Sequence, residues 1–460
     1  MAGRYKTYSE YQPSNDVHIK QLPIGWIMKP LGLVAAKGRT SFVDGPFGSD
    51  LKSDEYQDEG IPLIQLNNIV IGKHILQNMK YITEEKMHQL SRHIAKPNDI
   101  VIAKMAEPVA RATVVNGQYD KYVIVADCVK LTIDTSIADL SYVVYAINSK
   151  EVNSSAELVS TGTTRIRINL TGLKSLKIPF PPLAIQQKIA YFLEYETAKI
   201  DILINKQEKL IELLKEKRQA VISHAVTKGL NSDVPMKDSG VEWLGKVPEH
   251  WKNPKLIQIT ARIGDGLHST PKYADGTGYY FVNGNNIKDG SILISNTTKE
   301  VPESEYRQHA VPLGANSVFL SINGTIGSVA LYNDEPIILG KSAAYINCDE
   351  KLTPHFLMYF LQSNNAKRYY STEVTGTTIF NLSLNSIRQM NIPLPSLEEQ
   401  ISITLYCQRE LEKYNFLINK AETLINYIQE RKTALISAAV TGKIDVRDWK
   451  PVKNNLVEVA

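Results

Sequence analysis

An internal repeat constrains the fold of this chain more than any other feature. Residues 161–229 align with residues 375–443 without a gap, at a constant offset of 214 positions, and 27 of the 69 aligned positions are identical. Because so long a unit occurs only twice, the pattern indicates a duplicated domain and not a solenoid. It predicts a molecule with an internal pseudo-two-fold axis, and such a molecule suits a ligand made of two parts.

The composition limits the classes of protein to which the chain can belong. The length leaves room for about three domains, and the net charge is only +4. A surface that binds a polyanion must therefore be local. The three cysteines lack the CxxC spacing of a zinc site and fit a reducing cytoplasm, which is the expected location. No apolar run is long enough to span a membrane, so no membrane partner is expected.

Each half of the chain is expected to hold a β-rich globular part followed by a long helix. Short apolar runs between Gly, Pro, Asn and Asp residues are typical of strands. They occur at 61–66, 100–103 and 122–126, and again at 279–282, 317–322 and 336–339. Short helices are expected at 141–149 and 355–363, just before the TGTT segments that both copies share.

The long helices are predicted from their spacing of apolar residues. No glycine or proline occurs between Pro182 and Gly229, and the alternating 4-3 spacing there predicts a coiled-coil seam. The predicted positions are 189, 196, 203, 210 and 217 on one line and 193, 200, 207, 214 and 221 on the other. Their equivalents in the second copy are 403, 410, 417, 424 and 431 on one line and 407, 414, 421, 428 and 435 on the other. Each helix is roughly 65 Å long. Antiparallel pairing is expected because the second globular part lies between the helices.

A pair of helices leaves some apolar side chains uncovered, and we expect these to dock helices of partner proteins. The predicted partner-docking residues are Leu203, Leu210, Leu214, Leu417, Leu424 and Ile428. The alternative is that such side chains pack against the globular parts of the same chain. Residues 229–245 are polar and are expected to form a linker between the halves.

No catalytic constellation is recognisable in the sequence. Gly340–Ser342 imitates the end of a phosphate-binding loop, but Glu335 stands where that loop needs its first glycine. HExxH, GxSxG and GxGxxG are absent, as is the Asn-Pro-Pro-aromatic signature of adenine methyltransferases. No catalytic residue, metal site or cofactor is therefore expected. A nuclease site made of acidic residues far apart in the sequence stays open as an alternative.

Three kinds of segment carry residues suited to DNA. The first is the loop 161–167, whose hydroxyls and exposed amides suit phosphate oxygens and whose arginines suit phosphate or guanine. Its second copy keeps TGTT but has Ile379 and Asn381 in place of the arginines, which favours a shared grip on the backbone and a varied reading of sequence. The predicted contacts are Thr161, Gly162, Thr163, Thr164, Arg165 and Arg167, with Thr375, Gly376, Thr377 and Thr378. The alternative is a tight turn whose threonines cap the following segment.

The other two kinds are glycine-rich entry segments and the ends of predicted strands. The entry segments, 44–49 and 264–273, contribute Gly48 and Ser49, and His268, Ser269 and Lys272. The strand ends contribute Lys104, Arg111 and Asn323. Ordinary solvated surface loops are the alternative for both.

These motifs together resemble the specificity subunit of type I restriction–modification systems. The resemblance includes P-x-P-x-x-x-x-Q (Pro179, Pro181, Gln186 and Pro393, Pro395, Gln400), the LINK stretches, and the closing Ala225–Thr227 and Ala439–Thr441. The stretch 239–251 is similar to the entry of a recognition domain, whereas its counterpart at 16–26 is degenerate. The resemblance extends from about residue 17 to residue 446 and is weakest inside the globular parts.

The resemblance implies an α+β fold of two β-rich target-recognition domains related by pseudo-two-fold symmetry and joined by two long antiparallel coiled-coil helices. The implied segments are recognition domains at 1–180 and 246–395, helices at 181–228 and 396–446, a linker at 229–245 and a tail at 447–460. Each domain would read one half of a bipartite site in double-stranded DNA, and the helices would fix the spacer.

The resemblance also implies partners. Two methyltransferase subunits carrying S-adenosylmethionine would dock on the helices and methylate a flipped-out adenine, and a motor-nuclease restriction subunit would join them. This chain would be a targeting subunit without catalysis. The alternatives are a coiled-coil adaptor that binds no DNA and a single-chain nuclease. The unequal loops on a shared frame weigh against the adaptor, and the missing motifs weigh against the enzyme.

Overall fold

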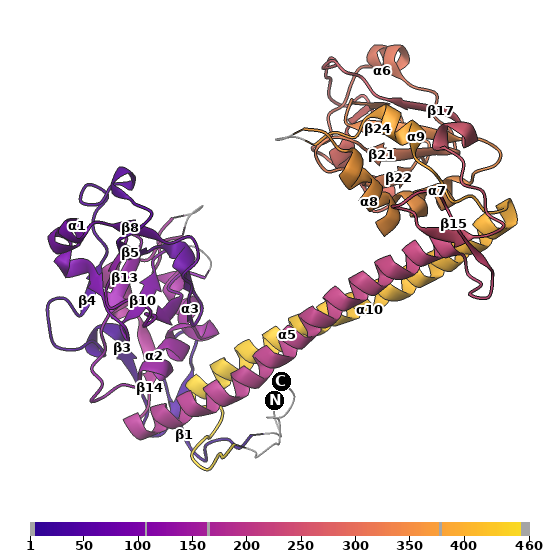
Figure 1. Cartoon of the computed structure of the whole chain (residues 1–460). Coiled ribbons are helices and arrows are strands. Elements are labelled where there is room, and N and C mark those ends of the chain that lie inside the picture. Colours follow the sequence, from indigo (N-terminus) through magenta and orange to yellow (C-terminus); the bar gives the residue numbers. More distant parts are fainter. Residues whose placement is uncertain (1–4, 106–107, 163–165, 377–379, 452–460) are drawn as a thin grey trace. The chain divides into compact units, whose positions relative to one another are not determined.

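The computed structural model of the protein describes residues 5–105, 108–162, 166–376 and 380–451. The chain forms two compact units (Figure 1). Unit 1 comprises Met1–Lys206 with Leu424–Ala460, and unit 2 comprises Gln207–Thr423. The two long helices, α5 (Leu183–Lys228) and α10 (Leu397–Val440), each contribute one part to unit 1 and the other part to unit 2. Each unit therefore contains a globular domain and two helical segments.

The domain of unit 1 is built on two small sheets. The antiparallel sheet has the order β11-β10-β13-β4, and the second sheet has the order β8-β5-β12-β9 with β5 and β12 parallel. β10 lies between two cores because its side chains alternate between the faces of the sheet. Ile100 and Ile102 pack into the core that contains α2, whereas Val101 and Ala103 pack toward β12.

The elements of unit 1 have the following bounds: β1 Tyr11–Pro13, β2 Gln21–Pro23, β3 Ile27–Pro30, β4 Phe42–Asp44, β5 Ile61–Ile64, β6 Ile69–Val70, β7 Lys73–His74, β8 Lys80–Ile82, β9 Ile94–Ala95, β10 Ile100–Ala103, β11 Ala112–Val114, β12 Tyr122–Ile124, β13 Cys128–Leu131 and β14 Lys177–Phe180, with α1 Glu84–Gln89, α2 Leu140–Ile147, α3 Lys150–Leu158 and α4 Leu170–Ser175. The helix predicted at 141–149 corresponds to α2.

Unit 2 repeats the strand order of the antiparallel sheet and the parallel strand pair of the second sheet. Its antiparallel sheet runs β17-β24-β21-β22, and β18 pairs with β23 in parallel, as β5 does with β12. The bounds are β15 Met236–Asp238, β16 Lys246–Pro248, β17 Thr260–Asp265, β18 Tyr280–Val282, β19 Ile287–Lys288, β20 Ser291–Ile292, β21 Ser317–Ser321, β22 Val329–Leu331, β23 Ile337–Leu339 and β24 Ala343–Cys348, with α6 Glu303–His309, α7 Pro354–Leu361, α8 Asn364–Glu373 and α9 Leu384–Gln389. The duplication read from the sequence is thus a duplication of the fold.

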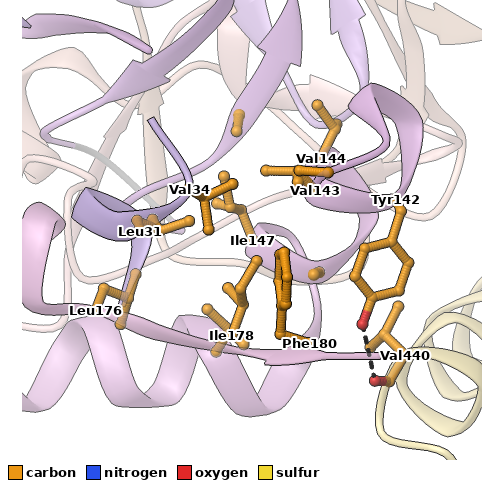
Figure 2. Packing of buried hydrophobic residues seen from close by; sticks show 14 of the residues in the cluster. Leu31, Val34, Tyr142, Val143, Val144, Ile147, Leu176, Ile178, Phe180 and Val440 are labelled. Carbon is orange, nitrogen blue, oxygen red and sulfur yellow. Dashed lines mark hydrogen bonds between the residues drawn. The ribbon is translucent and has the colours of Figure 1, made fainter. Parts of the chain in front are cut away.

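The core of unit 1 joins the globular domain to the long helices (Figure 2). Ile178 and Phe180 of β14 lie beside Ile147 of α2. The buried Tyr142 hydroxyl donates to the carbonyl of Pro179 at 2.7 Å and lies 3.5 Å from the carbonyl of Val440, at the end of α10. A buried hydroxyl needs such partners, so Tyr142 ties the domain to the end of α10.

The P-x-P-x-x-x-x-Q motif has a structural role in both units. The Gln186 side chain is fully buried, accepts from the amide of Asp139 at 3.0 Å, and donates to the carbonyl of Pro181 at 2.8 Å. Gln400 accepts in the same way from the amide of Thr353 and donates to the carbonyl of Pro395. Asp139 and Thr353 immediately precede α2 and α7. The glutamine therefore fixes the start of each long helix against the first turn of a domain helix.

The helix pairing corrects the predicted seam by one residue along one of its two lines. The line 407, 414, 421, 428 and 435 is buried or half-buried, as predicted, but the line that alternates with it is 411, 418, 425 and 432. In α5 the observed seam is likewise 193, 197, 200, 204, 207, 211, 214 and 218. Within unit 1 the pairing is antiparallel and includes an ion pair between Lys432 and Asp201 at 2.6 Å. In unit 2, Arg218 donates to Asn415.

Adjacent apolar residues explain the shift of this line. Leu-Ile pairs occur at 203–204, 210–211, 417–418 and 424–425, so either member satisfies a 4-3 pattern. The structure places the isoleucine of each pair in the seam and leaves the leucine outward. Leu203, Leu210, Leu417 and Leu424 are accordingly 38–49% exposed, whereas the predicted docking residues Leu214 and Ile428 are half-buried in the seam.

Candidate nucleic-acid interface

The candidate DNA segments of unit 1 meet at one end of the antiparallel sheet. The amide of Lys104, just after β10, donates to the carbonyl of Asp127 at 2.9 Å, and the amide of Ile168 donates to the carbonyl of Lys104 at 3.0 Å. The amide of Gly45, just after β4, donates to the carbonyl of Cys128. We call this surface edge 1; it comprises 44–49, 103–105, Asp127, 161–162 and 166–168. The sequence had offered these segments as separate candidates.

Unit 2 assembles an equivalent surface, edge 2, from 265–273, 321–324, 340–342, 375–376 and 380–382. The amide of Ile322 donates to the carbonyl of Ser342 at 3.0 Å, and the amide of Leu382 donates to the carbonyl of Ile322 at 2.8 Å. Leu267 forms a bridge with Gly340. The same backbone contacts therefore position different side chains in the two units.

A two-bond backbone clasp holds each TGTT loop at its edge. Thr161 and Arg167 exchange amide–carbonyl bonds of 2.9 Å in edge 1, and Thr375 and Asn381 do the same in edge 2 at 3.0 and 2.9 Å. Gly162 has a φ of 101° and Gly376 has a φ of 108°, values that favour glycine. Four of the predicted loop residues lie within the described part of the chain, and all four are exposed: Thr161, Gly162, Thr375 and Gly376. Thr163, Thr164, Arg165, Thr377 and Thr378 lie outside the described residues.

Arg167 is the accessible cation of edge 1 in the described part of the chain. Its guanidinium pairs with Asp127 at 2.8 Å, and its side chain keeps 47% of its surface exposed. Its equivalent in edge 2 is the neutral Asn381, which is also exposed. The two edges thus differ in charge at one shared backbone position.

Lys104 and Arg111, which the sequence predicts as DNA contacts, are held inside unit 1 instead. The Lys104 side chain is 6% exposed and its ammonium lies 3.2 Å from the carboxylate of Asp44. Arg111 donates to the carbonyls of Leu66, Ile69 and Met105 at 2.8, 2.6 and 3.2 Å. A buried ammonium needs a counter-charge, and burial lowers the pKa of the Arg111 guanidinium. Lys104 is therefore buried below the surface of edge 1, and the half-buried Arg111 has its guanidinium engaged by backbone carbonyls.

The entry segments place their predicted residues at the surface. Gly48 and Ser49 are exposed, as are Ser269 and Lys272. The His268 ring lies 2.7 Å from the carboxylate of Asp265, and its side chain is 71% exposed. Asn323 is half-buried and forms a backbone bridge with Asn381. All of these except Asn323 are exposed to solvent.

Each entry segment contains a glycine at which the fold leaves no room for a Cβ atom. A Cβ on Gly45 would lie 1.9 Å from the carbonyl oxygen of Val125, and a Cβ on Gly266 would lie 2.1 Å from that of Leu339. At both edges the chain therefore passes directly over the end of a strand of the neighbouring sheet. By contrast, a Cβ on Gly48 meets no atom within 4 Å.

Sequence reasoning did not single out Asp44, Phe47, Ile166 and Phe380, although they lie in its candidate segments, and it did not consider Asp127. The partners of the two aspartates are remote in sequence, so no local pattern reveals them. Ile166 and Phe380 occupy equivalent positions of the repeat, and that offset could have drawn attention to them. Their conspicuous feature, exposure, is visible only in the structure.

Neither a metal site nor a membrane span is found in the part of the chain that the structure describes. Within residues 5–105, 108–162, 166–376 and 380–451, no three His, Cys, Asp or Glu side chains are grouped to hold a metal ion. None of the helices in these ranges combines the length and apolar character that crossing a membrane requires.

Comparison with known proteins finds one family. A family model described as the type I restriction modification DNA specificity domain matches residues 47–213 and 248–430. A putative type I restriction enzyme MjaX specificity subunit of Methanocaldococcus jannaschii is 24% identical over 402 residues, which are 84% of this chain and 88% of that protein. The EcoKI specificity subunit of Escherichia coli K12 is 21% identical, over 95% of this chain and 93% of that protein.

Solved structures share the fold. The HsdS subunit from Thermoanaerobacter tengcongensis superimposes with a TM-score of 0.50 at 17% identity, covering 92% of this chain and 98% of that one. A chain from a type I R-M system, solved in work on complex assembly and conformational transition, gives a TM-score of 0.62 at 16% identity, covering 92% of this chain and 99% of that one. The α+β fold with two β-rich recognition domains and two long helices is thus confirmed.

Proposed function

We propose, since this chain belongs to the family of type I restriction modification DNA specificity proteins, that it is the subunit that directs such a complex to a bipartite DNA sequence. Each unit reads one half of the site through its edge. The observation that carries this proposal is the pair of edges. The same backbone contacts hold both, while their exposed side chains differ. A reader of two unlike half-sites needs this combination.

The chemistry of the edges fits a division of labour between phosphates and bases. The exposed threonine hydroxyls and glycine backbone at 161–162 and 375–376 suit phosphate oxygens, which position a protein on the duplex. Arg167 suits the O6 and N7 acceptors of guanine, and Asn381 suits adenine. Both residues close a clasp, and the residue after each donates its amide to the loop that follows a central strand, so the fold fixes the backbone from which they would reach a base.

The long helices support docking of two methylation subunits. Unit 1 exposes Ile202 and Leu203 of α5 with Leu424 and Tyr427 of α10. Unit 2 exposes the repeat equivalents, Phe416 and Leu417 of α10 with Leu210 and Leu213 of α5. Two equivalent apolar surfaces suit two copies of one partner. We assign them to methyltransferase subunits that bind S-adenosylmethionine, and a motor-nuclease subunit completes the restriction complex.

This role requires no catalytic residue in the chain itself. The methyl donor and the reacting adenine belong to the methylation subunits, and the adenine leaves the stack before it reacts. What the chain contributes is selection of the site and, through the helices, the distance between its halves.

Mapping adenine methylation across the genome tests the proposal. Cells with and without this chain are compared, with the neighbouring methyltransferase present in both. We expect a split motif that is methylated only when the chain is present, and this motif gives both half-sites and the spacer. Unchanged methylation would favour a coiled-coil adaptor, and methyl transfer or cleavage by the isolated chain would favour an enzyme.

A further inference from the structure

Besides Arg167 and Asn381, two further surface positions differ between edge 1 and edge 2, and the sheet pairings establish which residues are equivalent at the first. Asp44 lies opposite Val129, the second residue of β13, and Asp265 lies opposite Ala344, the second residue of β24. The glycines Gly45 and Gly266 follow. Two residues further on, edge 1 has Phe47 and edge 2 has His268.

The second position lies in the TGTT loops. Ile166 and Phe380 are equivalent at the repeat offset of 214 residues, and each directly precedes the residue that closes the clasp. The amide of Gly324 donates to the carbonyl of Phe380 at 3.2 Å, which attaches Phe380 to the loop that follows β21. The backbone of Phe380 is therefore fixed by a hydrogen bond.

All three apolar side chains at these positions face solvent. Phe47 is 79% exposed, Phe380 is 53% exposed and Ile166 is 39% exposed. The carbonyl of Phe47 accepts from the amides of Asp50 and Leu51 at 2.8 and 3.3 Å, so this residue also stands on a fixed backbone. An exposed phenylalanine on a fixed backbone adds nothing to the core and is ready to bury its ring against a partner.

We infer that these two positions are specificity determinants and that Phe47 in edge 1 and Phe380 in edge 2 contact the 5-methyl group of a thymine. The inference rests on the proposed function. In the major groove the thymine methyl is the apolar group among base edges, and phenylalanine is one of the side chains that contact it. The aromatic ring stands on the entry segment in edge 1 and on the loop in edge 2, so each edge places its apolar contact differently.

At the first of the two positions, edge 2 has a polar residue. Where edge 1 has Phe47, edge 2 has His268, a polar ring held by Asp265 at 2.7 Å. It offers a hydrogen bond to a base edge at the place where edge 1 offers an apolar contact. Exchanging one residue at each position thus changes what a half-site must present while the backbone stays the same.

The experiment replaces each thymine of the two half-sites by uracil, one at a time, which removes only the methyl group. After the motif has been mapped, binding of each substituted DNA to the complete methyltransferase complex is measured. We expect one uracil in the half-site read by edge 2 to weaken binding about fourfold, the change given by losing burial of one methyl-sized group. With Phe380→Ala the thymine and uracil sites should bind equally, whereas Phe380→Leu should keep part of the difference.

Phe47→Ala is the matched variant for the other edge. It should abolish a uracil effect in the half-site read by edge 1 and leave that of edge 2 unchanged. Equal melting temperatures of the variant and parent complexes show that the fold is intact. A half-site without thymine, an absent uracil effect, or an effect that survives Phe380→Ala overturns the inference. If the parent complex binds DNA without any sequence preference, the proposed function itself is refuted.

Discussion

At the scale of residues, the two glycines without room for a Cβ atom, Gly45 and Gly266, have the clearest consequence. The fold allows no Cβ at Gly45, because the carbonyl of Val125 lies 1.9 Å from its position. We expect Gly45→Ala to force the entry segment away from the strand end and to destabilise the protein by about 1–3 kcal/mol, as overpacking does. The variant should also weaken reading of the first half-site.

Gly48→Ala is the control for this prediction, since no atom lies within 4 Å of its Cβ position. Thermal unfolding and half-site binding of both variants are compared with the parent protein. A melting temperature that falls equally in both variants would show that glycine is needed in this segment for some reason other than the contact with Val125.

Arg167 carries the second prediction at this scale. Its side chain is about half exposed, and its guanidinium pairs with Asp127. If it contacts a base, Arg167→Ala should cost about 1–3 kcal/mol for the first half-site only. The measurement is binding to sites with substitutions in either half, at several salt concentrations. An equal loss on all sequences, with a weaker dependence on salt, would identify a phosphate contact instead.

The same residues show what the sequence could predict at this scale. The repeat identified the TGTT loops and the entry segments, because their residues are shared or are equivalent in position. It did not predict that Lys104 is buried, because that depends on Asp44, which comes from another strand. Nor could it bring the segments into one edge, since the sheet order that joins β4, β10 and β13 is set by long-range pairing.

At the scale of elements, the long helices were predicted closely but their seam was not. Helical spacing predicts the two long helices and the resemblance implies the bounds 181–228 and 396–446, whereas the structure has Leu183–Lys228 and Leu397–Val440. The second helix ends earlier because Gly442, with a φ of 73°, lies just beyond it. Adjacent Leu-Ile pairs left the register undecided, since both members fit the spacing, and packing selects the isoleucine.

The pair Leu417 and Ile418 tests this assignment within unit 2. Ile418 is 5% exposed in the seam, whereas its neighbour Leu417 is 38% exposed. We expect Ile418→Ala to lower the free energy of unfolding by about 2–5 kcal/mol and Leu417→Ala to leave it within about 0.5 kcal/mol. Leu417→Ala should instead weaken assembly with the methyltransferase subunit, which is measured by titration of the two proteins. Equal destabilisation by both would contradict the observed register.

At the scale of the whole molecule, the proposed function predicts that the length of the two long helices sets the length of the DNA spacer. Inserting one heptad after Lys209 and one at the equivalent position after Thr423 lengthens both helices by about 10 Å and keeps the 4-3 spacing of the seam. The insertions leave every side chain of the edges and of both apolar docking surfaces in place. We expect the tolerated spacer to grow by about three base pairs, at about 3.4 Å each, while both half-sites stay the same.

The measurement is selection of bound DNA from a library that varies spacer and half-sites together. A heptad inserted in α5 alone is the control, because it displaces the seam of one helix against the other and should impair assembly whatever the spacer. An unchanged spacer in the double insertion, with intact assembly, would mean that the helices do not set the distance. A changed half-site would mean that the edges do not read sequence independently of the helices, and the division of labour that we propose would then be wrong.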